Sequence, residues 1–256
     1  MTTGSTTTRR LALVLLAALA GCGGKKKKNG GDGPGTGGPT DLPSAPATGP
    51  APIGKFKITG KVTHPGPAES KVMGMNADTA TCGTSQPDPA SIQLADGKLL
   101  NVAVHLEGTP KGADPRGSKP KIDQHKCRYL PYVQTATAGD TLTIGNRDNV
   151  LHNVHAYENG DSTLFNASSP AGVAASEDLA NPGPVQLKCD VHPWMAAWVW
   201  IFDHPYHGST GETGSFELPA PPPGEYELVA WHEKAGMKKL KVTVPAEGDV
   251  TIDVAY

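Results

Sequence analysis

The chain has 256 residues, with 23 lysines and arginines against 25 aspartates and glutamates, which gives a formal net charge of −2. This near-neutral balance, without a basic stripe, argues against nucleic acid as a partner. Once a short N-terminal region is set aside, roughly 200 residues remain, enough for one elaborate domain or two small ones.

The N-terminus has the charge order of a secretory signal peptide. Arg9 and Arg10 precede an apolar run, Leu11 to Ala20, that is too short to span a bilayer. The run ends in Leu-Ala-Gly followed by Cys22, which resembles a bacterial lipobox. The resemblance implies that 1–22 is a lipoprotein signal region and that Cys22 carries the lipid. An ordinary signal peptide containing a cysteine is the alternative.

Residues 23–54 form the next region, rich in Gly, Pro, Thr and Ala, with four consecutive lysines at its start. Such a composition cannot bury enough apolar surface to offset the entropy of ordering, so we expect a flexible tether. The lysines either contact anionic headgroups or are simply solvated. We therefore expect a protein that is secreted across the inner membrane and held by its lipid, facing the periplasm or on the outer membrane or cell surface.

The rest of the chain shows short runs of alternating apolar residues, which are typical of half-buried strands. Helical periodicity is nearly absent, and Gly, Pro, Asn and Asp separate the runs as turn formers. The fold class is therefore all-β, with 108–121 as a surface loop and 167–184 as a long connection. Expected strands include 56–62, 102–106, 141–144, 197–202, 226–229, 240–244 and 250–254.

Four side chains form a candidate copper site. Cys189, His192 and Met195 lie within seven residues on one loop between two expected strands, and His152 follows the strand at 141–144. Thiolate and thioether sulfurs favour Cu(I), whereas imidazoles accommodate Cu(II). Two histidines, one cysteine and a weak axial methionine are therefore the donor set of a type 1 (blue) copper site.

Two sequence segments around these ligands resemble the cupredoxins amicyanin and plastocyanin. Residues 139–155 resemble the segment with the first ligand, and Cys-x-x-His-x-x-Met has the spacing of the amicyanin loop. The likeness covers about residues 130–203 and implies a Greek-key β-sandwich with one copper and His152 as the first ligand. It also implies that Asn153 ties two loops together beside the thiolate.

The same resemblance implies where the electron leaves. In that family the imidazole that corresponds to His192 reaches the surface in an apolar patch. Pro193 and Trp194 are apolar residues in a turn, where polar residues are usual. They are therefore candidates to surround the site and to dock a redox protein partner briefly. The alternative for Trp194 is a plug buried in the core.

Other metals fit this pattern less well. Zinc favours more cysteine or histidine and no methionine, and no Cys-x-x-Cys-His sequence offers covalent haem attachment. A binuclear copper centre needs a second cysteine close to Cys189 in the sequence, and none is there. A cupredoxin fold with another metal, or with none, stays open.

Four cysteines are present. With Cys22 assigned to lipid and Cys189 to copper, Cys82 and Cys127 remain in an oxidising compartment, where free thiols are unusual. The sequence therefore predicts a Cys82–Cys127 disulfide that fastens the irregular segment 64–98 to the domain. Two unpaired thiols, or a bond with Cys189, are the alternatives.

Segments 214–218 and 222–228, within residues 207–256, resemble a carboxypeptidase-regulatory-like, transthyretin-type β-module, and 58–62 and 101–106 resemble its first strands. The likeness implies a copper domain over 55–203 and a smaller module over 204–256, which either interleaves with early strands from 55–107 or forms a short appendage. Most of the mature chain also resembles bacterial plastocyanin-like proteins of the methylamine-utilisation type. That likeness is carried by 123–131, 204–206, 214–216, 222–226 and 231–232.

The resulting hypothesis is a lipid-anchored carrier of single electrons and not an enzyme. A copper-dependent oxidoreductase and a surface interaction lipoprotein with a cupredoxin scaffold are the alternatives. Four of the seven histidines outside the predicted copper site are expected to be surface or hydrogen-bonding residues without a role in this hypothesis. They are His155, His204, His207 and His232.

Overall fold

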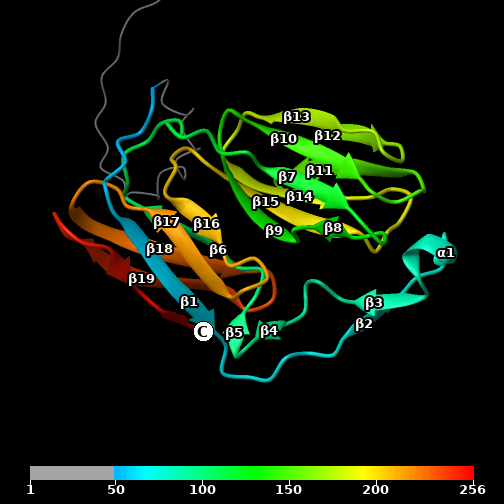
Figure 1. Cartoon of the computed structure of the whole chain (residues 1–256), viewed down its shortest axis with the longest axis horizontal. Helices are drawn as coiled ribbons and strands as arrows, with labels where there is room; N and C mark the ends of the chain where they lie inside the picture. Colours follow the sequence, from blue (N-terminus) through cyan, green and yellow to red (C-terminus); the bar gives the residue numbers. More distant parts are fainter. Residues whose placement is uncertain (1–48) are drawn as a thin grey trace, which may run out of the picture. The chain divides into compact units, whose positions relative to one another are not determined.

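Strands make up nearly all the regular structure of residues 49–256, the part of the chain that the computed structural model describes (Figure 1). Cys22 and the signal region lie outside the described residues, as does the tether up to residue 48. Within the described part, no helix is long and apolar enough to cross a membrane. The all-β prediction is confirmed.

Residues 49–54 correct the expected end of the tether. Pro50 forms a β-bridge with Ala113, and Ala51 is buried. The hydroxyl of Tyr206 donates a hydrogen bond to the carbonyl of Pro52. These contacts attach residues 50–52 to the folded part, so these residues do not belong to the predicted tether.

Two sheets enclose the core that contains the candidate ligands Cys189 and Met195. The first has the order β12-β11-β14-β15-β9 and the second β13-β10-β7-β8. The strands of the first are β9 (Val133–Thr137), β11 (His152–Glu158), β12 (Ser162–Ser169), β14 (Gly183–Lys188) and β15 (Ala196–Phe202). Those of the second are β7 (Lys121–Gln124), β8 (Tyr129–Leu130), β10 (Asp140–Asn146) and β13 (Ala175–Leu179). We call this pair of sheets the ligand sandwich.

The expected long connection at 167–184 is wrong in part, because it contains β13, which pairs antiparallel with β10. Alternate residues of β13 are exposed, and its sequence is Ala-Ser-Glu-Asp-Leu. Asp, Glu and Ser favour turns or helices over strands. The extended conformation of this edge strand therefore comes from its pairing with β10. The sequence of β13 alone does not predict a strand.

Two further sheets enclose a second core, which we call the second sandwich. The first sheet contains β1 (Lys57–Thr63), β4 (Leu94–Ala95), β5 (Lys98–Leu99), β17 (Ser215–Pro219), β20 (Val250–Thr251) and β21 (Val254–Ala255). The second contains β6 (Ala103–Glu107), β16 (His207–Ser209), β18 (Gly224–His232) and β19 (Gly236–Val244). The expected strand at 250–254 is thus two short strands, both paired with β1.

Strands from both ends of the described chain pair in this second sandwich. β1 lies antiparallel to β17, and β6 lies antiparallel to both β16 and β18. Figure 1 shows the blue β1 among the orange and red C-terminal strands. The ligand sandwich is therefore inserted in sequence between early and late strands of the second one, as the interleaved alternative requires.

A small hairpin with a helical turn completes the structure. It consists of β2 (Val72–Gly74), α1 (Thr79–Cys82) and β3 (Ser85–Pro87). Cys82, at the end of α1, forms the predicted disulfide with Cys127. The bond joins this hairpin to the loop that precedes β8.

Candidate metal centre

Three of the four predicted ligands meet at one end of the ligand sandwich. His152 is the first residue of β11, and Cys189 and His192 lie on the loop between β14 and β15. One donor atom from each lies within 4.8 Å of the other two. All three side chains are buried, Cys189 at 3% and both histidines at 0% exposure.

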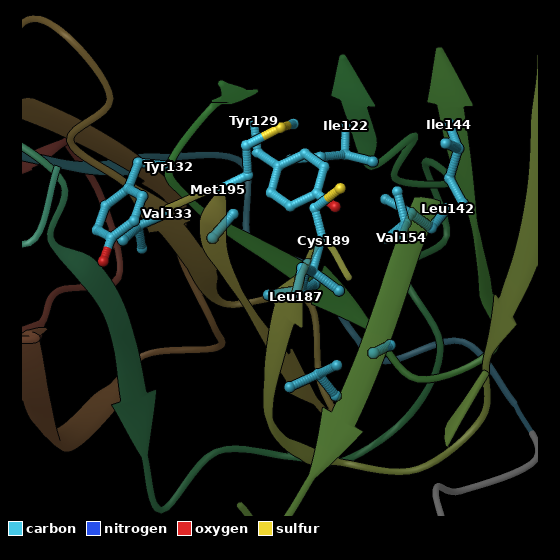
Figure 2. Packing of buried hydrophobic residues seen from close by; sticks show 14 of the residues in the cluster. Ile122, Tyr129, Tyr132, Val133, Leu142, Ile144, Val154, Leu187, Cys189 and Met195 are labelled. Atoms are coloured by element: carbon cyan, nitrogen blue, oxygen red, sulfur yellow. The ribbon is translucent and has the colours of Figure 1, made fainter. Parts of the chain in front are cut away.

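Met195 closes the same loop. Its backbone amide donates to the carbonyl of His192 at 2.9 Å, and its carbonyl accepts from the amide of Cys189 at 3.3 Å. Its side chain is 1% exposed, and Figure 2 shows Cys189 and Met195 among the same group of buried side chains. The turn formed by Cys-x-x-His-x-x-Met thus places the thioether in the core that contains the thiol.

Hydrogen bonds hold the sulfur of Cys189 in place. The thiol donates to Oδ1 of Asn153 at 3.3 Å, and the backbone amide of His192 donates to the sulfur at 3.4 Å. Oδ1 of Asn153 also accepts from the backbone amide of Asp190 at 2.8 Å. Asn153 therefore joins β11 to the ligand loop beside Cys189, the position that the cupredoxin resemblance implied for it.

The outer nitrogens of both imidazoles contact carboxylates. Nε2 of His152 lies 3.0 Å from Oδ2 of Asp148, and Nε2 of His192 lies 2.9 Å from Oδ2 of Asp78. Burial disfavours the ionised form of Asp148. Hydrogen bonds from the Cys127 amide and from His152 outweigh burial and hold the pKa of Asp148 below its ordinary value. Asp148 is therefore suited to accept the ring N–H of His152, and Asp78 lies within hydrogen-bond distance of the ring of His192.

The inner nitrogens then face one another. Nδ1 of His152 and Nδ1 of His192 are 2.9 Å apart. A neutral imidazole has a single ring proton, so a ring that donates from Nε2 presents only a lone pair at Nδ1. If both rings donate from Nε2, two lone pairs meet at this distance, an arrangement that a proton or a metal ion between them would stabilise.

A proton is the less favourable cation. Burial, together with the neighbouring His192, lowers the pKa of His152 below its ordinary value, although Asp148 raises it. Two Nδ1 lone pairs, a buried thiol and a buried thioether are the donor types of a type 1 copper site. The residues therefore fit copper, which Nδ1 of His152 and Nδ1 of His192 would bind.

The structure corrects the expected surface around His192. Asp78 covers the outer edge of the imidazole, and the ring is fully buried instead of reaching the surface. Pro193 is exposed, whereas Trp194 is half-buried. The indole N–H of Trp194 donates to the carbonyl of Cys127 at 3.2 Å, and its ring centroid lies 5.1 Å from that of His192. Trp194 thus packs beside the site and against the core.

Two residues of the site were not predicted. Asp148 precedes His152 by four positions, inside the segment that resembles the cupredoxin first-ligand region, so its spacing was an available signal. Asp78 is 114 positions from His192, in a segment without regular periodicity. Only the folded chain brings it to the ligand.

The four surplus histidines have hydrogen-bonding partners. Both ring nitrogens of His207 lie within 3.0 Å of threonine hydroxyls, those of Thr135 and Thr137. His204 and His232 accept backbone amides through Nδ1. His155 lies 3.1 Å from the carboxylate of Asp190. All four histidines therefore make the hydrogen bonds that the sequence analysis expected of them.

No protein-family model matches the chain, and no curated protein matches it. Among solved structures, a purple cupredoxin from Nitrosopumilus maritimus is 22% identical over 33% of this chain and 100% of its own, with a TM-score of 0.30. A Cu(I) form of an amicyanin mutant is 22% identical over 39% of this chain and 98% of its own, with a TM-score of 0.30. A copper-containing nitrite reductase from Thermus scotoductus SA-01 is 16% identical, with a TM-score of 0.31. This chain spans only 22% of that enzyme's length. The copper assignment rests on the geometry of the site itself.

Proposed function

We propose that the chain is a type 1 copper protein that carries single electrons. The observation that supports this most strongly is the meeting of His152, Cys189 and His192 within 4.8 Å, with both outer imidazole nitrogens on carboxylates. Bound copper would supply a one-electron centre that alternates between Cu(II) and Cu(I).

The protein's own residues would keep this centre nearly unchanged between the two oxidation states. Asn153 and the His192 amide hold the sulfur, and two carboxylates fix the ring planes. Ligands that are already oriented need little reorganisation when an electron arrives or leaves. Burial of the ligands excludes water from competing for the metal.

The proposal extends to the cellular setting. Lipidation at Cys22 would attach the chain to a membrane, and residues 23–48 would act as a tether of roughly 25 Å root-mean-square length. We place the protein in the periplasm or at the outer membrane or cell surface, exchanging electrons with redox proteins by brief docking. We propose no reaction of its own for it.

Metal analysis with a visible spectrum of the full chain tests the proposal. We expect one copper per chain and an intense visible band from copper–thiolate charge transfer on adding Cu(II). Colourless copper binding, or a clear preference for zinc, would overturn it. Turnover of nitrite or another small substrate by the loaded protein would favour a copper-dependent oxidoreductase instead.

A further inference from the structure

Residues 72–87 form a cap over the outer edge of His192. This cap consists of β2, α1 and β3, and its Asp78 places Oδ2 2.9 Å from Nε2 of His192. The carboxylate side chain is 43% exposed, whereas the imidazole that it meets is 0% exposed. Asp78 therefore lies between a candidate copper ligand and solvent.

The side chain of Asp78 does not cap helix α1, although Asp78 occupies its N-cap position. An aspartate at an N-cap position usually accepts a hydrogen bond from a backbone N–H of the first turn. Here it makes no such bond, and its φ of 45° lies in the left-handed region, which is uncommon for a residue other than glycine. The side chain is directed to His192 instead of to its own helix.

A disulfide and several hydrogen bonds fasten the cap to the ligand sandwich. The Cys82–Cys127 disulfide joins the end of α1 to the loop before β8. Its sulfurs lie within 4.8 Å of a ring nitrogen of His192. On the other side, Thr81 donates from Oγ1 to Oδ1 of Asn149 at 2.6 Å. The position of Asp78 is thus fixed relative to the ligand.

We propose that Asp78 is a positioning residue for the copper site, which rests on the copper role proposed above. By accepting the Nε2–H of His192 it fixes the tautomer, aims Nδ1 at the metal and prevents the ring from turning outward. His192 then stays a ligand in both oxidation states, and the cap retards the loss of copper. Its negative charge also favours Cu(II) over Cu(I).

Two substitutions in the full chain separate these effects. Asp78→Ala removes both the hydrogen bond and the charge, whereas Asp78→Asn keeps an acceptor oxygen and removes only the charge. Outer partners of ligating histidines contribute 10- to 100-fold in metal affinity. We expect Asp78→Ala to release Cu(I) to a chelator at least tenfold faster and Asp78→Asn to be intermediate.

Both variants should also favour Cu(I) by roughly tenfold, which raises the one-electron potential by about 59 mV. Asp161→Asn is the charge-matched control. Asp161 lies in the turn after β11, about 20 Å along the strand from His152, and its loss should leave release and potential unchanged. Thermal unfolding of each variant shows whether it is folded.

Imidazole ¹⁵N NMR of the metal-free chain gives a readout that needs no copper. The wild type should show a slowly exchanging Nε2–H for His192, and Asp78→Ala should lose it. A blue wild type whose Asp78→Ala variant keeps that proton and the wild-type release rate would overturn this inference alone. A wild type without the copper–thiolate band would overturn the proposed function and the role of Asp78 with it.

Discussion

At the ligand residues, Cys189 and His192 are held by groups from other parts of the chain, whereas His152 and Met195 are held by residues close to them in sequence. The spacing of Cys189, His192 and Met195 could be interpreted from the sequence because one short turn brings all three together. His152 and Asn153 could be placed only through a resemblance. Asp78 could not be predicted, since a disulfide and a 114-residue separation decide its position.

The thiolate can be tested directly. Cys189 is the free cysteine among the described residues, and it is buried. Cys189→Ser should abolish the intense visible band of the copper-loaded chain, because that band requires copper–thiolate charge transfer. Visible and electron paramagnetic resonance spectra are the measurement. A serine variant that stays blue would show that another sulfur is the ligand.

Substitution of Met195, the predicted axial ligand, should leave copper bound and change the potential. Met195 is expected to bind weakly and to adjust the potential without holding the metal. Met195→Leu keeps the buried volume nearly constant, so copper should remain bound. The potential should rise, because a weaker axial field in a dry site favours Cu(I). Voltammetry and metal analysis measure both effects, and loss of the copper would contradict this role.

At the scale of elements, alternation located the strands with strong apolar faces. The expected strands at 56–62 and 197–202 correspond to β1 and β15 within one residue at each end. β13 was missed because its polar sequence pairs only through its neighbour. The cap was expected as irregular chain, and its short strands and helical turn have too few residues for a period to show.

The Cys82–Cys127 disulfide stabilises the folded chain by joining the cap to the ligand sandwich. Cys82 and Cys127 are 45 positions apart, and closing a loop of that length is worth about 4 kcal/mol by loss of entropy in the unfolded chain. Replacing both cysteines with serine should reduce the free energy of unfolding by about that amount. Denaturant titration of the metal-free chain measures it. An unchanged midpoint would mean that the cap is held without the bond.

At the scale of the whole described chain, a cluster of rings lies where β15 and its following loop meet β6 and β16. The ring of Phe202 stacks against those of His105, His204 and His207, at centroid distances of 4.4, 5.5 and 5.2 Å. His207 also bonds both Thr135 and Thr137 of β9. This cluster therefore joins strands of the ligand sandwich to strands of the second one.

Burial sets the protonation of this cluster. It is the largest cause of a pKa lowered to about 3 for His105, about 4 for His204 and about 3 for His207. In the unfolded chain each histidine titrates near 6.5. Between these values the unfolded state binds more protons than the folded state, so stability falls as the pH is lowered. The contribution is complete above about pH 6.5 and is lost progressively down to the folded pKa values of about 3 to 4.

We therefore expect the unfolding temperature of the metal-free chain to drop steeply between pH 6.5 and pH 4.5, above the range in which most carboxylates titrate. Each buried histidine should contribute on the order of 1 kcal/mol for every pH unit below about 6. Calorimetry across this range measures the slope. His105 stacks on Phe202 with ring centroids 4.4 Å apart. His105→Phe removes one titrating ring but keeps an aromatic partner for Phe202. The variant should therefore show a shallower dependence of the unfolding temperature on pH. Equal slopes in both proteins would mean that His105 takes up its proton without unfolding, and that the ring cluster tolerates charge.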